Sequence, residues 1–495
     1  MERMSLPEAF VKTTGELMGE ERFSRYLASF SEEVPVSIRI NPRRMEGKRW
    51  SVEGGEPVPW CRHAYYLSER PNFTFDPLLH AGCYYVQEAA SMFLDEVLRQ
   101  HLPALTQQPS SLRSTSGRSQ GENSQLSSLI SQPSSLRSTS GRSQGENPQP
   151  STLNPQPSSL RSTSGRSQGE NSQPSSLNSQ LSTLNSQLST LNSLDLCAAP
   201  GGKSTLMRSA LPEGSVLYSN EPVAKRASIL LENITKWGYP DSIVTNSYPR
   251  DYVRSGLMFD LILCDVPCSG EGMFRKDPQT IGEWSPQNVE KCWRLQRDIV
   301  SDAWQCLSSG GLLIYSTCTF NIKENEENIR WIMDTFDAEV LPVATDPSWG
   351  ITGSLLKDFD APVYRFIPGI TRSEGLFMAV LRKGGSPLPC PTKEQKKGHR
   401  GVKGQVLQVM SPIPHREGVE DSGVDLTFAQ AIAYLRGEAL VLPAEVPRGI
   451  VNVTFMGHPL GQVKNLGTRA NNLYPKEWRI KSTHIPTTFV SPLIS

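Results

Sequence analysis

The 495-residue chain lacks an excess of either charge, because its 50 Lys and Arg residues are balanced by 50 Asp and Glu residues. This balance excludes nucleic-acid recognition through overall charge, so a basic binding surface would have to be a local patch. The sequence also has no apolar run approaching the ~18 residues of a membrane span, and no signal-peptide apolar region at its N-terminus. These absences lead us to expect a cytoplasmic protein without a membrane partner.

Closely spaced cysteine pairs are absent as well. The nine cysteines form no CxxC pair, which argues against zinc ribbons and disulfide scaffolds, and no metal site is predicted. Most of the cysteines are expected to be small buried residues. With 37% hydrophobic and 20% charged residues, the composition is that of a globular protein, and the length predicts two or three domains.

Residues 104–192 contain hardly any apolar residue other than leucine. The motif QPSSLRSTSGRSQGEN occurs three times, beginning at Gln108, Gln132 and Gln156, and LNSQLST then recurs every seven residues up to Ser193. A stretch of this composition buries too little apolar surface to offset an ordering entropy of roughly 1–2 kcal/mol per residue. We therefore predict a disordered insertion over residues 104–192 and expect proteases to cut there first.

The rest of the chain divides into four parts. Residues 1–103 form an N-terminal segment with a strand pattern in VPVSIRINP and an amphipathic lead-in helix in QEAASMFLDEVLRQ. Residues 193–383 alternate between strand and helix patterns. Residues 384–412, which contain Pro, Gly and KEQKKGHR, are predicted to be a linker. Residues 413–495, with the helix pattern FAQAIAYLRG and the hairpin pattern GIVNVTFMGHPLGQV, predict a small α+β or β-barrel module.

The alternating part of the chain predicts an α/β fold, a doubly wound parallel sheet with helices on both faces. After a first strand in SLDL, the expected strands cover residues 215–220, 242–245, 259–266, 312–317 and 375–383. The expected helices cover residues 222–238, 286–307 and 322–336. Gly310 and Gly311 are expected to end the second of these helices, and Asn321 and Glu324 to cap the third.

The stretch LDLCAAPGGKST, residues 194–205, joins an apolar strand to the start of a helix through a tight turn. In doubly wound sheets, ligands bind beyond the carboxyl ends of the strands, beside the first glycine-rich turn. Gly201 and Gly202 permit a close approach of the backbone and unusual φ angles. The second strand ends at Glu221, whose carboxylate can accept hydrogen bonds from ribose hydroxyls. The pattern therefore predicts a cofactor that contains a nucleoside.

Two nucleoside cofactors are candidates, NAD and S-adenosylmethionine. The dinucleotide fingerprint GxGxxG is absent from the turn, which has no third glycine for helix packing around a pyrophosphate. Asp195, the proline inside the turn and the acidic end of the second strand suit the smaller, cationic S-adenosylmethionine better. We therefore predict S-adenosylmethionine, and observed NAD binding would favour an oxidoreductase instead.

Two cysteines follow neighbouring strands at the same edge of the sheet. Cys268 lies in CDVPCSGEGMFRKDP and Cys318 in YSTCTFN. Beside a methyl donor, such a pair indicates methylation of a pyrimidine at C5, because a thiolate that adds to C6 makes C5 nucleophilic enough to take a methyl group. Asp265, three residues before Cys268, is placed to stabilise charge near N3 of the ring. A second cysteine can assist release of the product.

These motifs resemble those of the RNA cytosine-C5 methyltransferases of the Nol/Nop/Sun type, in their RsmF-like branch of bacterial ribosomal RNA enzymes. The resemblance covers most of the chain outside the insertion, and the paired motifs PCSGEG and STCT are highly specific. It implies a Rossmann-like methyltransferase core in which Cys318 is the nucleophile, Cys268 assists product release, and Lys203 supports Asp265 and the target base. The cofactor-binding residues that it implies are Cys197, Ala198, Ala199, Pro200, Gly201, Gly202, Lys203, Glu221 and Asp265.

The same resemblance implies RNA-binding modules on both sides of the core. VSIRINP is similar to the family's RRM-like segment, and the C-terminal part resembles its PUA-like module. In that module, aromatic and basic side chains suit base stacking and phosphate contacts; they are Arg469, Tyr474, Lys476, Trp478 and Arg479. FRKDP could supply further phosphate contacts, whereas KEQKKGHR is better interpreted as a solvated linker.

The chain departs from the family in two places. Many members hold the adenosine with an Asp after the third strand, where TNSYPRDY here places Tyr248, and Asp251 or the backbone could substitute. The insertion also replaces residues that normally lead into the first strand, which could weaken the sheet.

The sequence thus predicts a monomeric enzyme that methylates C5 of cytosine in RNA, with 16S ribosomal RNA as the favoured substrate. Three alternatives stay open. Transfer RNA could be the substrate; a DNA cytosine methyltransferase would use Cys268 as its nucleophile; and a non-catalytic RNA-binding protein could retain the cofactor pocket. The presence of Cys318, Cys268, Asp265 and Lys203 argues against the last of these.

Overall fold

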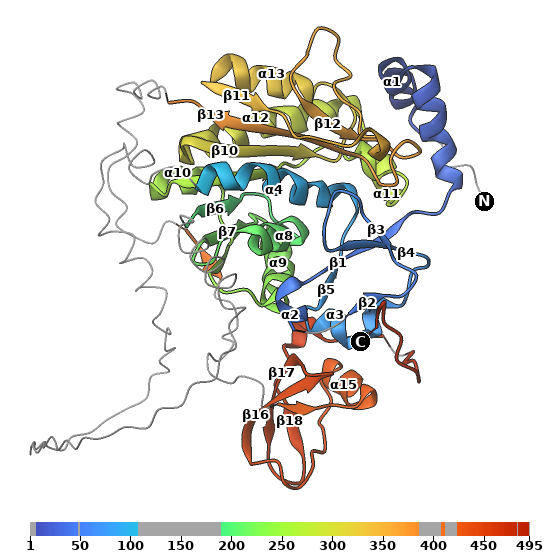
Figure 1. The fold of residues 1–495 in the computed structure, drawn as a ribbon, viewed down its shortest axis with the longest axis vertical. Helices are drawn as coiled ribbons and strands as arrows, with labels where there is room; N and C mark the ends of the chain where they lie inside the picture. Colours follow the sequence, from blue (N-terminus) through green and yellow to red (C-terminus); the bar gives the residue numbers. More distant parts are fainter. Residues whose placement is uncertain are drawn as a thin grey trace, which may run out of the picture. The chain divides into compact units, whose positions relative to one another are not determined.

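The computed structural model describes residues 6–47, 50–106, 190–385, 407–410, 423–482 and 484–494. They form an N-terminal module, a central sheet with helices on both faces, and a C-terminal module (Figure 1). Most of the predicted insertion lies outside the described residues. Its predicted boundaries are wrong, however, because residues 104–106 complete a helix and residues 190–192 lead into and begin the first strand of the central sheet.

Part of the predicted linker belongs to the central sheet. Val409–Met410 forms β14, which pairs antiparallel with β8 (Ser242–Thr245). Leu407 is buried, and the Gln408 N–H donates to Ser247 Oγ at 3.0 Å. The apolar residues in this short stretch cover an edge strand, which corrects the prediction of a linker over all of 384–412. KEQKKGHR lies outside the described residues.

The N-terminal module is a four-stranded antiparallel sheet preceded by helix α1 (Glu8–Ala28). Its strands, in spatial order, are β3 (Glu56–Pro57), β4 (Ala64–Leu67), β1 (Val36–Ile40) and β5 (Tyr84–Val86). The short helix α2 (Pro42–Met45) follows β1, and the short helix α3 (Pro77–His80) precedes β5. Strand β2 (Ser51–Val52) pairs with β19 (Leu493–Ile494) near the C-terminus. Strand β1 confirms the strand that VSIRINP predicts.

Arg39, in the segment expected to contact RNA, is instead buried and bound within the protein. Its Nη2 donates to Thr205 Oγ1 at 2.6 Å and to Gly202 O at 3.1 Å, and its Nε to Gln87 Oε1 at 2.9 Å. Burial lowers the pKa of Arg39 to about 10. Strand β1 therefore attaches the N-terminal module to the helix that follows the glycine-rich turn.

The central sheet has the strand order β11–β13–β10–β9–β6–β7–β8–β14. Its parallel strands are β6 (Asn192–Asp195), β7 (Val216–Asn220), β8, β9 (Phe259–Asp265) and β10 (Leu307–Thr317). They confirm the predicted doubly wound arrangement. The chain order changes direction between the neighbours β6 and β9, and such a switch point is where sheets of this type bind ligands.

The last strands of the sheet run antiparallel. Strand β13 (Leu376–Lys383) is antiparallel to β10, to β11 (Ala338–Leu341) and to β12 (Val363–Phe366). The prediction of a parallel strand at the end of this part is therefore wrong. The connection between β12 and β13 is too short to hold a crossover helix, and a short connection joins antiparallel strands.

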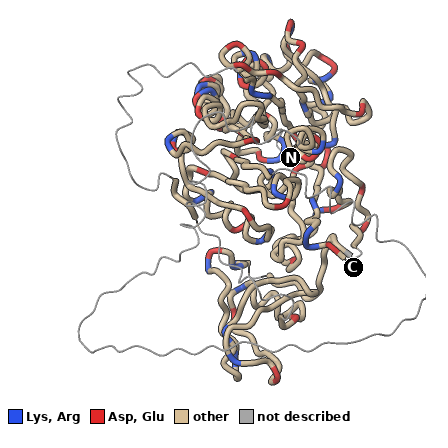
Figure 2. The backbone as a smooth tube through the Cα atoms, turned by 60° about the vertical axis from the view of Figure 1, so that its left-hand side comes forward, with Lys and Arg blue, Asp and Glu red and all other residues tan. Residues whose placement is uncertain are grey.

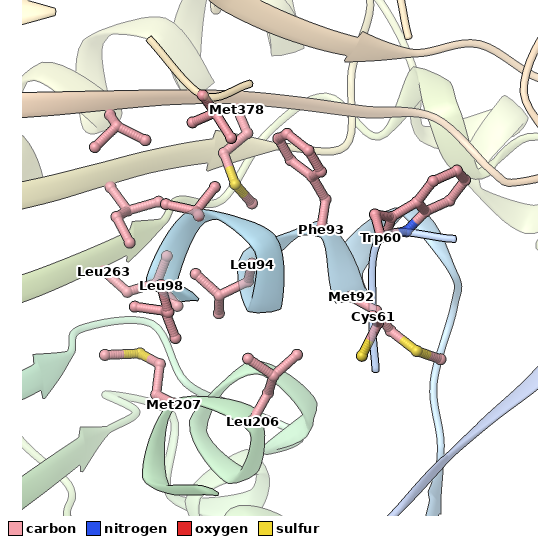
Figure 3. Packing of buried hydrophobic residues seen from close by; sticks show 14 of the residues in the cluster. Trp60, Cys61, Met92, Phe93, Leu94, Leu98, Leu206, Met207, Leu263 and Met378 are labelled. Atoms are coloured by element: carbon pink, nitrogen blue, oxygen red, sulfur yellow. The ribbon is translucent and has the colours of Figure 1, made fainter. Parts of the chain in front are cut away.

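Helices cover both faces of the sheet. One face carries α4 (Phe93–Thr106), α8 (Gly202–Ala210) and α9 (Ala224–Trp237), and the other α10 (Pro249–Ser255), α12 (Pro286–Cys306) and α13 (Glu326–Thr335) (Figure 1). Side chains of β9 alternate between them: Leu261 and Leu263 pack under α4 and α8, and Ile262 and Cys264 under α12. Figure 3 shows the first of these clusters, with Leu94 and Leu98 of α4 above Leu206 and Met207 of α8.

Two expected helix boundaries differ from the structure. Helix α12 passes directly into β10, so Gly310 and Gly311 lie at a register shift inside that strand rather than at a helix end. Asn321 and Glu324 do pair, with the Glu324 N–H donating to Asn321 Oδ1 at 2.9 Å. Because α13 begins at Glu326, this pair closes the turn before the helix instead of capping it.

The C-terminal module contains α15 (Phe428–Leu435) and a sheet of β15 (Val424–Asp425), β16 (Gly449–Phe455), β17 (His458–Asn465) and β18 (Ala470–Asn472). These elements confirm the predicted helix and hairpin. Tyr474, expected to stack on a base, is buried in the core, and Trp478 packs on it at 6.0 Å between ring centroids. Arg469 and Lys476 are exposed.

Charged residues of both signs are interspersed along the described chain (Figure 2), as the balanced composition implies. Within the described ranges, no helix has the length and apolar character needed to cross a membrane.

Candidate active site

The turn between β6 and α8 lies at the carboxyl edge of the sheet, beside the ends of β7 and β8. Asn220, the last residue of β7, ties these ends together, because its Nδ2 donates to Leu196 O at 3.1 Å and to Ser247 O at 2.9 Å. The Ala198 N–H donates to Asn220 O at 2.8 Å. The sequence-predicted turn is therefore fixed at the switch point of the sheet.

Two side chains of α9 hold carbonyl groups of the turn. Arg226 Nη2 donates to Ala199 O at 3.1 Å, and Asn233 Nδ2 donates to Pro200 O at 2.8 Å. These bonds attach the turn to α9.

Gly201 has a φ of 115°, the unusual backbone conformation that the sequence predicts. A Cβ atom there would lie 3.3 Å from Leu230 Cδ1, and one on Gly202 would lie 3.4 Å from Tyr85 Cε1. Side chains of α9 and β5 therefore lie close to the backbone of the two glycines.

Glu221 lies just beyond the end of β7, as predicted, and its side chain is 1% exposed. Its Oε1 accepts a hydrogen bond from the Val223 N–H at 3.0 Å, and its Oε2 lies 3.2 Å from Arg226 Nη1. Because Arg226 also binds Ala199 O, one guanidinium links the turn to this carboxylate. A hydrogen bond from a ribose hydroxyl to Glu221 stays a prediction.

Asp195, at the end of β6, is fully buried at the start of the turn. Its Oδ2 accepts a hydrogen bond from Ser204 Oγ at 2.5 Å, whereas Oδ1 has no partner within the described residues. Burial raises the pKa of Asp195 to about 7, and the bond from Ser204 partly opposes that shift. The raised pKa thus reflects the cost of a charged side chain in this buried position.

The raised pKa of Asp195 makes stability depend on pH. Between about pH 4 and pH 7 the folded protein keeps a proton that the unfolded chain releases, so this residue's contribution falls as the pH rises through that window. We expect Asp195→Asn, which cannot titrate, to gain stability relative to the wild type by a few kcal/mol between pH 4 and pH 8. Urea unfolding of both proteins across this range tests the prediction, and a difference that does not change with pH contradicts it.

Lys203 and Asp265 form an ion pair, with Nζ 2.9 Å from Oδ2. Ser316 Oγ donates to the other carboxylate oxygen, Oδ1, at 2.6 Å, and Lys203 Nζ lies 3.5 Å from Ser91 Oγ. Burial lowers the pKa of Lys203, but the attraction of Asp265 outweighs it and the net shift is upward. Lys203 is therefore a stable cation that can support Asp265, as the sequence predicts.

Cys268 and Cys318 meet at the same edge, with their Sγ atoms 3.2 Å apart. The Cys318 N–H also donates to Cys268 Sγ at 3.3 Å. The pKa of Cys268 is raised well above its usual value, chiefly because its thiol is hydrogen-bonded to Cys318 and also because it is buried. The two sulfurs therefore share one hydrogen bond, in which either thiol can be the donor.

Gly375 allows the loop that carries Cys268 to lie directly on the segment before β13. Its N–H donates to Gly272 O at 3.1 Å, and a Cβ atom on Gly375 would lie 2.7 Å from Phe320 Cζ. We expect Gly375→Ala to lower the free energy of unfolding by about 1–3 kcal/mol through overpacking. Urea unfolding measures this effect. The matched control is Gly353→Ala, whose Cβ would have no neighbour within 4 Å, and equal losses in both variants would contradict the prediction.

Two residues offered by the sequence as ligand contacts have other partners. Asp251 accepts a hydrogen bond from the Tyr248 N–H at 3.0 Å and pairs with Arg254 at 3.0 Å, so it caps α10, and its contact with adenosine stays a prediction. Arg275, in FRKDP, is buried against Glu374 at 2.6 Å. It is therefore not available for a phosphate contact.

Three family models match successive parts of the chain. The model of the 16S rRNA methyltransferase RsmB/F matches residues 182–382, that of the N-terminal domain of 16S rRNA methyltransferase RsmF matches residues 6–89, and that of the methyltransferase RsmF PUA domain matches residues 422–480. The chain belongs to the RsmF family.

Similar proteins agree with this assignment. The ribosomal RNA small subunit methyltransferase F of Cronobacter sakazakii is 28% identical over 350 residues, which cover 57% of this chain and 72% of that protein. The protein of the same name from Escherichia coli O157:H7 is 29% identical with the same coverage. Among solved structures, the chain in the crystal structure of PH0851 is 17% identical to this chain, with a TM-score of 0.51. The match covers 76% of this chain and 66% of that chain, and it supports the fold alone.

As a member of the RsmF family, the chain is an S-adenosylmethionine-dependent ribosomal RNA methyltransferase with a PUA domain. The residues at the sheet edge fit this cofactor, because Asp195, Glu221 and Asp265 bring acidic groups close to the turn. The bound cofactor supplies a methyl group on a positively charged sulfur.

Sequence reasoning missed two polar side chains of this RsmF-family site. Ser316, which orients Asp265, lies inside the motif YSTCTFN and could have been identified from its place at the end of β10. Arg226, which binds Glu221 and Ala199, lies on α9 without any motif around it.

Burial also raises the pKa of Cys197 well above its usual value, so this cysteine lines the turn as a thiol.

Proposed function

We propose that this RsmF-family chain methylates C5 of a cytosine in 16S ribosomal RNA through a covalent bond between Cys318 Sγ and C6 of the base. The observation that carries the proposal is the 3.2 Å distance between the sulfurs of Cys268 and Cys318, at the sheet edge that holds the cofactor turn. The RsmB/F model and the names of the curated relatives support the ribosomal substrate.

In the first step, the Cys318 thiolate adds to C6 and the electrons of the C5–C6 double bond activate C5. N3 takes a proton from the carboxyl group of Asp265, which neutralises the negative charge that develops on the ring. Lys203 then pairs with the carboxylate that remains, in the geometry fixed by the 2.9 Å contact and by Ser316. The assignment of the attack to Cys318 follows the family resemblance of the STCT motif, and the Cys268 sulfur lies 3.2 Å from it.

Product formation reverses the addition. After C5 has taken the methyl group, the C5 proton is lost to water and N3 returns its proton to Asp265. The C5–C6 double bond forms again and Cys318 leaves as a thiolate. The thiol of Cys268, 3.2 Å away, stabilises the leaving sulfur through a hydrogen bond.

RNA must present the cytosine outside its base stack, as for other enzymes that react with ring atoms. The exposed Arg469 and Lys476 of the PUA domain supply charges for the RNA backbone. The cytoplasmic location and monomeric state expected from the sequence belong to the same proposal.

Covalent trapping tests the proposal. RNA that contains 5-fluorocytosine blocks removal of the C5 substituent, so the protein should become linked to it in the presence of S-adenosylmethionine. We expect a complex with 16S ribosomal RNA that resists denaturation and that Cys318→Ala abolishes. Linkage to transfer RNA alone, or to DNA alone, would reassign the substrate, and a folded protein that binds S-adenosylmethionine but forms no adduct would support the non-catalytic alternative.

A further inference from the structure

The loops that carry the two cysteines are each anchored by a buried glutamate of the other loop. We call them the β9 loop, residues 266–274 with Cys268, and the β10 loop, residues 318–325 with Cys318. Glu271 lies in the β9 loop and Glu324 in the β10 loop, and their exposed fractions are 1% and 0%. Neither residue is needed for the steps of the proposed reaction.

Glu271 reaches from the β9 loop to the backbone of the β10 loop. Its Oε2 accepts hydrogen bonds from the N–H groups of Phe320 at 2.7 Å and Asn321 at 2.8 Å. Its Oε1 accepts bonds from Asn321 Nδ2 at 3.0 Å and from Trp284 Nε1 at 2.9 Å. All four groups are donors, and only an ionised carboxylate can accept from all of them.

Glu324 makes the reciprocal contact from the β10 loop. Its Oε2 accepts a hydrogen bond from the Ser269 N–H, next to Cys268, at 3.1 Å and another from Gln296 Nε2 at 2.7 Å. Its Oε1 accepts from Asn321 Nδ2 at 2.8 Å. Gln296 also donates to Pro267 O at 2.9 Å, so helix α12 supports both loops.

Two further bonds join the loops beside the cysteines. The hydroxyl groups of Ser269 and Thr319 lie 2.9 Å apart, and the Gly272 N–H donates to Cys318 O at 2.9 Å. The residues that follow Cys268 and Cys318 are thus bonded to each other. The distance between the two sulfurs is consequently set by loop-to-loop hydrogen bonds and not by either strand alone.

We propose that Glu271 and Glu324 are positioning residues that hold Cys268 and Cys318 in the relative placement that methyl transfer requires. This inference rests on the proposed function, in which Cys318 forms the bond to C6. A displacement of the reacting atom by about 1 Å can cost on the order of 100-fold in rate, so loosening one loop should slow adduct formation far more than it weakens cofactor binding.

The experiment compares Glu271→Gln and Glu324→Gln with the wild type. Glutamine keeps the size of the side chain but turns one acceptor oxygen into a donor that faces other donors. Three quantities are measured for each protein: the rate of covalent linkage to 16S ribosomal RNA containing 5-fluorocytosine, kcat, and the KM for S-adenosylmethionine. The temperature is one at which circular dichroism shows each protein to be folded. Glu96→Gln serves as the matched control, because Glu96 is 5% exposed but lies on α4 and bonds Arg99 and Gln100.

We expect both loop variants to lower kcat and the linkage rate by about 10- to 100-fold, with the KM for S-adenosylmethionine nearly unchanged and Glu96→Gln close to the wild type. Folded variants that form the adduct at the wild-type rate would overturn this inference but would leave the proposed function intact. If either variant does not fold, Thr319→Val is measured instead, because it removes the hydroxyl contacts to Ser269 and to Asn321 Nδ2 and leaves both glutamates in place. It should give a smaller loss in the same direction, and an unchanged rate would overturn the inference. Absence of an adduct with the wild type would instead refute the proposed function.

Discussion

Replacing Cys318 with alanine is expected to lower the single-turnover rate of methyl transfer by about 10⁴-fold or more. Alanine cannot form the bond to C6 that activates C5, and the remaining residues can only orient the base and the cofactor. Binding of S-adenosylmethionine should be unchanged, because Asp195 and Glu221 belong to other strand ends. Transfer of radiolabelled methyl groups to 16S ribosomal RNA, together with a titration of the cofactor, measures both quantities.

Cys268→Ala is the control for this experiment, since it removes a sulfur from the same pair. We expect this variant to form the bond to C6 and to transfer the methyl group, but to release the product slowly. A covalent complex of protein and RNA should therefore accumulate on a denaturing gel without 5-fluorocytosine. The opposite pattern, in which Cys268→Ala abolishes the adduct and Cys318→Ala retains it, would make Cys268 the nucleophile.

Asp265→Asn is expected to lower kcat by about 10²- to 10³-fold, the usual cost of removing a group that stabilises transition-state charge. An amide at this position cannot carry the proton or the charge needed at N3, and it also loses the ion pair with Lys203. Steady-state kinetics with 16S ribosomal RNA, with kcat and the KM for S-adenosylmethionine determined separately, measure the effect.

Ser316→Ala is the matched comparison for Asp265→Asn. It removes one hydrogen bond to Asp265 Oδ1 and leaves the carboxylate in place, so a loss of about 3- to 10-fold in kcat is expected. If Asp265→Asn raised the KM for S-adenosylmethionine while kcat stayed constant, Asp265 would be a cofactor-binding residue only. That result would contradict its proposed role at N3 of the cytosine.

Much of the candidate site could be predicted because strand order determines it. Cys268 and Cys318 follow β9 and β10, which are neighbours in the parallel sheet, and the carboxyl ends of parallel strands share one edge. The approach of Lys203 to Asp265 was implied by the family resemblance, and the structure accounts for it because α8 follows β6, the other neighbour of β9. Motif and topology predicted that the two cysteines meet, and the resemblance supplied the lysine.

Contacts that depend on side-chain packing could not be predicted. Arg275 and Tyr474 have residue types suited to RNA, but the first pairs with a buried glutamate and the second completes a hydrophobic core. Glu271 stands in a recognised motif, yet nothing in the spacing shows that its acceptors face the backbone of another loop. Such roles become visible only when residues distant in sequence are placed in three dimensions.

Helix α4 ends at Thr106 and strand β6 begins at Asn192, so whatever joins them enters the sheet at the amino end of its first strand. The cofactor turn and both cysteines stand at the opposite, carboxyl edge. For protein engineering, this connection is accordingly a site at which the chain can be interrupted or extended. A reporter domain, an affinity tag or new termini could be introduced between α4 and β6 with the reacting groups a full strand length away.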